Sequence, residues 1–141
     1  MTPDQTTLVQ DSFRLIPPIA EPAAAIFYEK LFALDPGLRP LFAGADMHAQ
    51  GRKLMAAIGF VVANLRTPES LLPAVAELGR RHAAYGVRAA HYATVGTALL
   101  ATLEEGLGPH FTPAVRNAWA AAYGLLAEVM QHAAEAPARA A

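Results

Sequence analysis

The sequence predicts an all-α fold, and three observations support this prediction. Alanine accounts for 32 of the 141 residues, and it has the highest helix propensity because it loses no side-chain rotamer freedom in a helix. No segment alternates apolar and polar residues over six positions, as a half-buried strand would. Three Thr-Pro pairs suit helix starts, since threonine caps a first turn and proline fits its first position.

Start and stop signals define the helices of the first half of the chain. Thr2-Pro3 opens the first helix, with Gln5 completing a capping box, and Pro17-Pro18 ends it. Asp46 is a candidate N-cap for a long third helix. The expected helices span about 2–16, 19–34 and 46–65, with a short turn over 36–42.

The second half of the chain is divided in the same way. Thr67-Pro68 is expected to start a short helical segment, and Pro73 to stand in the first turn of a separate helix that ends near Gly86. A further helix is predicted from about 91 to 107. Thr112-Pro113 opens the last helix, and a frayed tail containing Pro137 is expected from about 134 to 141.

Composition limits the class of protein. Apolar residues make up 54% of the chain and charged residues 16%, which supports a buried core in one domain over residues 1–141. The absence of cysteine excludes disulfides and thiolate metal sites. The net charge of −1 gives no footprint for nucleic acid. With a polar start and no apolar run of about 20 residues, we expect a cytoplasmic protein outside the membrane.

His82 is the strongest candidate for a chemical role among the five histidines. It follows Val75 and Leu78 by seven and four residues, so it shares a helix face that should point inward. A histidine on an apolar face is more often a core residue than a ligand, and the spacing alone leaves both open. No two histidines stand four apart, so a helical zinc site is unsupported. We expect His48, His110 and His132 at the surface, and His91 just before a helix, where it can assist capping.

Other chemistry has little support. The sequence contains no glycine-rich phosphate loop, no Gly-x-Ser-x-Gly and no paired-carboxylate motif. The basic pairs Arg52-Lys53 and Arg80-Arg81 suit either plain solvated charge or two cationic sites that flank an acidic ligand.

Four segments, in order, resemble the globin family. The segment from Phe27 to Phe42 resembles the second globin helix and its following turn, and Leu78 to Val87 resembles the haem-ligand helix. His91 to Leu100 resembles the next helix, and Trp119 to Gly124 the last. The resemblance covers roughly residues 3–132 and is strongest to bacterial single-domain globins, the haem domain of flavohaemoglobins and neuroglobin. It implies a globin fold of six to eight helices around a haem b pocket.

The resemblance implies His82 as the proximal ligand of the haem iron, a role that suits a neutral imidazole whose second N–H has an acceptor. Phe42 would stack on the haem face. Gln50 matches the distal position, 32 residues before His82. Leu54 lies one helical turn after Gln50 and would line the same pocket.

Tyr28 matches a distal tyrosine, which with Gln50 would donate hydrogen bonds to an O₂ ligand; without the resemblance it would be expected as a core residue. Tyr92 matches a proximal tyrosine of flavohaemoglobins. The resemblance also implies Val87 as a haem contact and Lys53 and Arg81 as partners of the haem propionates, although simple exposure suits both basic residues equally well.

Two departures from the family pattern bear on function. Gln50 stands where neuroglobin has a histidine, and His48 would point about 200° away round the helix, so we expect an iron that can be pentacoordinate. The proximal glutamate of flavohaemoglobins falls on Ala134, with Glu135 one residue beyond.

The resemblance therefore implies a haem protein that reversibly binds O₂, and also CO and NO, for storage, delivery or scavenging. The alternative is a nitric oxide dioxygenase, which would need a separate reductase because these residues include no flavin domain. A gas sensor would need an output domain, and a haem-free helical adaptor would have to close the pocket. We expect a monomer or a weak homodimer.

Overall fold

The chain folds into helices with short connections, and the all-α prediction is confirmed. A computed structural model describes residues 1–135, which contain no β-strand. Among these residues, no helix has the length and apolar character needed to cross a membrane. The α-helices are α1 (Pro3–Phe13), α2 (Ala20–Leu34), α3 (Met47–Ala63), α4 (Pro68–Ala84), α5 (Ala89–Leu107) and α6 (Pro113–Glu135), and the 3₁₀ helices are η1 (Pro17–Ile19), η2 (Pro36–Phe42) and η3 (Gly108–His110).

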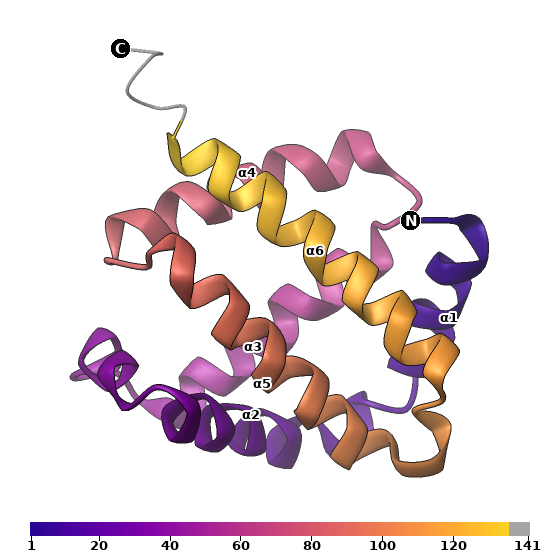
Figure 1. Ribbon diagram of the computed structural model, residues 1–141, viewed down its shortest axis with the longest axis horizontal. Helices are drawn as coiled ribbons and strands as arrows, with labels where there is room; N and C mark the ends of the chain where they lie inside the picture. The colour runs from indigo at the N-terminus through magenta and orange to yellow at the C-terminus, as the bar shows by residue number, and fades with distance from the viewer. Residues whose placement is uncertain (136–141) are drawn as a thin grey trace.

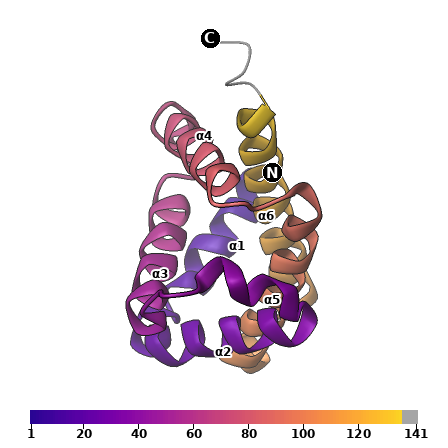
Figure 2. The same cartoon turned by 90° about the vertical axis from the view of Figure 1, so that its left-hand side faces the viewer.

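Four elements, namely α3, η2, α4 and α5, border one region of the molecule. α6 runs diagonally across the fold and packs against both α1 and α4 (Figure 1). α2 packs against α3 and α5. In the turned view, α3 and α5 lie on opposite sides, η2 crosses between them, and α4 lies above (Figure 2). These four elements carry every residue with a predicted role in ligand binding, except Tyr28 on α2 and Val87 after α4.

Three of the predicted helix starts are capped as expected. Thr2 Oγ1 accepts the N–H of Gln5 at 3.1 Å, and Gln5 Oε1 accepts the N–H of Thr2 at 3.0 Å, which completes the capping box. Asp46 accepts two N–H groups in the first turn of α3. Thr112 accepts an N–H in the first turn of α6 at 3.2 Å. Local signals in the sequence therefore set these boundaries.

The first helix ends earlier than predicted. α1 stops at Phe13, because the next three N–H groups bond to carbonyls only three residues before them, the tighter 3₁₀ pattern. Pro17 has no N–H, so it cannot continue the backbone hydrogen bonds of the helix. Ile16 is nevertheless buried, so its predicted apolar role is kept.

The predicted break before Pro73 is wrong, since α4 is one helix from Pro68 to Ala84. Proline within a helix removes an N–H and releases the carbonyl four residues earlier. Here that carbonyl belongs to Glu69, and both Pro73 and Glu69 are exposed. Water can satisfy the released carbonyl, so the helix continues.

Two helix ends also differ from the prediction. α5 begins at Ala89, so His91 lies inside its first turn rather than before it. Its capping role is confirmed, because His91 Nδ1 accepts the N–H of Arg88 at 2.9 Å. α6 includes residues 134 and 135, and the rest of the predicted frayed tail, 136–141, lies outside the described residues.

Trp119 joins α6 to α1 through a buried hydrogen bond. Its side chain is buried in the main core beside Val9 and Ile16. The indole N–H donates to Ser12 Oγ at 2.9 Å, and the Ser12 hydroxyl donates to the carbonyl of Leu8 at 2.7 Å. The buried indole N–H is therefore satisfied by a residue on another helix.

We expect Ser12→Ala to lower the free energy of unfolding by about 1–3 kcal/mol, because the indole N–H would stay buried without its acceptor. Urea unfolding followed by circular dichroism measures this loss. Thr97→Ala is the matched control, since it removes an exposed hydroxyl from α5 and should change stability by no more than about 0.5 kcal/mol. An equal loss in the two variants would contradict the role of the hydrogen bond.

Candidate haem-binding site

His82 lies in the last turn of α4 with its side chain half-buried. Its Nδ1 lies 2.9 Å from the backbone oxygen of Leu78. A carbonyl oxygen can only accept, so Nδ1 donates, and in the neutral ring Nε2 keeps its lone pair. Burial lowers the pKa of His82, more than the hydrogen bond to Leu78 raises it. The result is a neutral imidazole with an available nitrogen, which is the donor that haem iron takes from histidine.

This pKa predicts the acid sensitivity of the haem-free protein. Because the pKa of His82 lies below the ordinary 6.5 in the folded chain, the unfolded chain takes up the proton first, and stability falls from pH 6.5 down to the lowered pKa. We expect His82→Gln to remove this part of the pH dependence, measured as unfolding free energy from about pH 7 to about pH 5. The exposed His110→Gln control should retain it, and an unchanged profile in His82→Gln would refute the direction of the shift.

Gly86 fixes the turn that follows His82. Its φ of 98° is left-handed, a conformation that favours glycine. The N–H of Gly86 donates to the carbonyl of Ala83 at 3.1 Å, and the N–H of Val87 donates to the carbonyl of His82 at 3.0 Å. This pair of bonds is the Schellman helix ending. This helix ending fixes the position of Val87, which is half-buried and follows His82 by five residues.

The structure brings Tyr28 and Gln50 together. Tyr28 on α2 is 8% exposed, and its ring contacts the ring of Phe42 with centroids 5.4 Å apart. Burial raises the pKa of the Tyr28 hydroxyl, and an interaction with the Gln50 side chain lowers it by less. Tyr28 therefore keeps its proton at neutral pH and can donate it in a hydrogen bond. Gln50, half-buried in the first turn of α3, adds an amide donor beside it.

A set of half-buried apolar side chains lies against the buried cluster around Tyr28. They come from η2, α3 and α5, and they are Phe42, Met47, Leu54, Val95 and Leu99. Of these five residues, only Phe42 and Leu54 were predicted to take part in ligand binding. Met47 precedes Leu54 by two helical turns, so helix periodicity could have identified it. These side chains form one apolar wall, which is the kind of lining that cofactor sites have.

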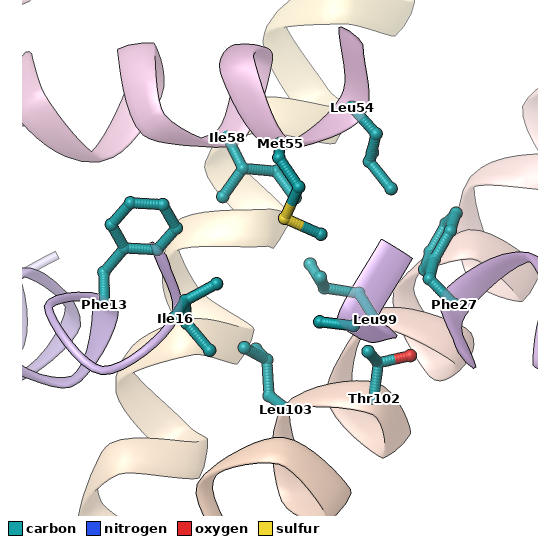
Figure 3. Close-up of a pocket in the computed structure, with 10 residues that line it drawn as sticks. Phe13, Ile16, Phe27, Leu54, Met55, Ile58, Leu99, Thr102 and Leu103 are labelled. Atoms are coloured by element: carbon teal, nitrogen blue, oxygen red, sulfur yellow. The ribbon is translucent and has the colours of Figure 1, made fainter. Parts of the chain in front are cut away.

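A small apolar pocket of about 20 Å³ adjoins this wall. Leu54 and Phe27 line it together with apolar residues of α1, α3 and α5 (Figure 3). The one polar side chain in the lining is Thr102, whose hydroxyl donates to the carbonyl of Ala98 at 2.7 Å. Water would find no free partner there. Leu54 therefore has an apolar environment on this side.

The three remaining residues with a predicted role in ligand binding lie on helices: Tyr92 on α5, Lys53 on α3 and Arg81 on α4. Tyr92 on α5 is half-buried and packs in the cluster that contains Leu78, and burial raises the pKa of its hydroxyl. Its backbone carbonyl accepts the hydroxyl of Tyr123 at 2.6 Å. Lys53 and Arg81 are exposed on α3 and α4, and Arg81 Nε lies 3.5 Å from Glu77 Oε1.

Both the sequence and the backbone of this chain match known proteins of one family. The family model named Globin matches residues 25–130. A flavohemoprotein from Bordetella parapertussis is 35% identical over 132 residues, which cover 92% of this chain and 33% of that protein. A flavohemoprotein from Rhizobium meliloti is 37% identical over 106 residues, or 74% of this chain and 26% of that protein. The chain thus spans about a quarter to a third of the length of these curated relatives.

The backbone has a close counterpart among solved structures. A bacterial globin from Campylobacter jejuni superimposes with a TM-score of 0.83 and 26% identity, covering 95% of this chain and 96% of that one. The globin fold expected from the four sequence segments is therefore confirmed. Because the family match extends from α2 through most of α6 and includes both the His82 helix and the Tyr28 helix, we conclude that this chain belongs to the globin family.

Proposed function

We propose that this protein holds haem b through His82 and reversibly binds O₂, with CO and NO as further ligands, in oxygen storage, delivery or scavenging. The observation that carries the proposal is the neutral His82 imidazole, with Nδ1 bound to Leu78. The Tyr28–Gln50 pair adds hydrogen-bond donors from α2 and α3. When bound, the haem supplies an iron with one open position for a diatomic gas. The relatives that match this chain are named for haem and flavin.

The proximal side of the site would be set by α4. The Leu78 carbonyl holds the His82 ring in one tautomer and one orientation, with Nε2 as the iron ligand. Val87 and Tyr92 would contact the macrocycle from the turn after α4 and from α5. Lys53 and Arg81, both exposed, would reach its propionates.

The distal side would be set by Tyr28 and Gln50. Their hydroxyl and amide groups would donate hydrogen bonds to O₂, which takes up negative charge when it binds, while CO would gain little from them. Phe42 and Leu54 would exclude water from the same space. His48 is exposed, with Nε2 3.5 Å from Glu21 Oε1, so it is not directed at the site, which supports a pentacoordinate iron.

A nitric oxide dioxygenase is the second candidate, because the same distal donors serve that reaction and the flavohemoprotein relatives are also named for a flavin. That activity would need electrons from a reductase outside these 141 residues. The proximal side favours reversible binding instead. His82 has an uncharged carbonyl as its partner, Ala134 is half-buried on α6, and Glu135 is exposed. A carbonyl increases the basicity of imidazole less than a carboxylate would.

The visible spectrum of the purified protein tests the proposal in the ferric state, after reduction with dithionite, and after addition of CO. We expect a Soret band that shifts on reduction and again with CO. Split low-spin bands in the reduced protein without added ligand would show a second internal ligand and contradict the pentacoordinate site. No Soret band after addition of haemin would overturn haem binding.

The dioxygenase candidate has its own measurement. NO consumption and nitrate formation are followed in the presence of O₂, with and without a supplied flavoprotein reductase. Sustained turnover that depends on the reductase would establish the enzyme. A single turnover per haem, even with reductase, would exclude it and leave reversible binding as the function.

A further inference from the structure

The backbones of α4 and α6 lie very close together at Gly79. A methyl group at this position would lie 2.6 Å from the Cα and 2.8 Å from the carbonyl carbon of Met130, and closer still to its carbonyl oxygen. All three atoms belong to the backbone, so no side-chain rotation could relieve the overlap. A glycine inside a helix is also disfavoured relative to alanine, so close packing accounts for its use here.

Gly79 and the ligand histidine belong to one rigid unit. Gly79 stands one turn before His82, and the His82 ring is bonded to Leu78, the residue next to Gly79. Leu71, Val75 and Leu78 continue the same face of α4 in a cluster with Met130. A shift of α4 at Gly79 would therefore carry the imidazole with it.

The opposing helix cannot easily yield. α6 is fixed on one side by the buried Trp119–Ser12 hydrogen bond. On another side, the Tyr123 hydroxyl donates to the carbonyl of Tyr92, and a methyl group on Gly96 would lie 2.8 Å from the Tyr123 ring. α4, whose C-terminal end leads into the exposed turn at Gly86, is the element that would move.

We propose that Gly79 is a positioning residue for the iron ligand: its missing side chain seats α4 against the backbone of α6, and the depth of this contact sets the position of the His82 imidazole that would hold the haem. The inference rests on the proposed haem-binding role of His82. A methyl group at Gly79 would displace α4 by about 1 Å to restore normal carbon–carbon contact. That displacement changes the strain on the bond between histidine and iron without altering either group.

The test compares Gly79→Ala with Gly124→Ala in the reduced haem protein. Gly124 lies on α6, where a methyl group would have no atom within 4 Å. We expect Gly79→Ala to shift the iron–histidine stretching band in the resonance Raman spectrum and to raise the haem dissociation rate about tenfold, while the control resembles the wild type. A wild-type band and dissociation rate in Gly79→Ala would overturn the proposal.

Two additions keep the test decisive. In the haem-free proteins, the NMR chemical shifts of the His82 ring should differ between Gly79→Ala and wild type, and unchanged shifts would contradict the displacement even if the wild type failed to bind haem. Failure of haem binding by the wild type would instead refute the proposed function.

If Gly79→Ala does not fold, Val75→Ile adds one methylene to the same helix contact. A shift of the iron–histidine band in Val75→Ile relative to wild type would support the proposal, and no shift would refute it.

Discussion

His82→Ala is expected to abolish stable haem binding, because this side chain is the proposed protein ligand of the iron. The neutral imidazole is held by the Leu78 carbonyl, and alanine provides no donor atom in its place. After incubation with haemin and gel filtration, the variant should retain far less than one haem per chain, whereas the wild type should retain about one. The measurement is the ratio of Soret to protein absorbance.

A second variant separates ligation from folding. His82→Gly leaves a space that free imidazole can enter, so added imidazole should restore a Soret band with a protein-bound spectrum. The control His110→Ala removes an exposed histidine in η3 and should bind haem normally. Full retention of haem by His82→Ala with an unchanged spectrum would eliminate the ligand assignment.

Tyr28→Phe is expected to accelerate O₂ dissociation by about 10- to 150-fold. The loss of a hydrogen bond to a charged partner costs about 1.5–3 kcal/mol, and each 1.4 kcal/mol is about a tenfold change in an equilibrium. The ring itself stays packed against Phe27 and Phe42, since only the hydroxyl is removed. CO dissociation should change much less, because CO takes up little charge.

Stopped-flow displacement of O₂ by CO gives the dissociation rate. Tyr85→Phe is the matched control, because Tyr85 is 72% exposed in the turn after α4 and removal of its hydroxyl should leave the rate unchanged. An O₂ dissociation rate in Tyr28→Phe equal to that of wild type would remove Tyr28 from the distal site.

Local signals in the sequence predicted most of the helices but not all of their ends. The caps at Thr2, Asp46 and Thr112 depend on neighbouring residues only, so they could be identified from the sequence. Pro73 could not, because the continuation of α4 depends on whether the released carbonyl of Glu69 faces water. That exposure is a property of the packed structure.

The candidate site, like the helices, could be predicted from the sequence only in part. Periodicity placed His82 on an inward face, and the resemblance to globins supplied its role and those of Tyr28 and Gln50. The interaction of Tyr28 with Gln50 joins α2 to α3, and it became visible only when these helices were packed. Gly79 could not be identified in advance, because its significance lies in Met130, a residue on another helix.

The hydrogen bond between Trp119 and Ser12 has a consequence for folding kinetics. It joins residues that are 107 positions apart, so a long loop must close before the indole finds its acceptor, and contacts of this range slow folding. Trp119 is the only tryptophan in the sequence. Its fluorescence therefore records the arrival of the last helix on the first, while circular dichroism records helices that can form earlier. The delay between the two signals would measure the time between helix formation and the docking of α6 on α1.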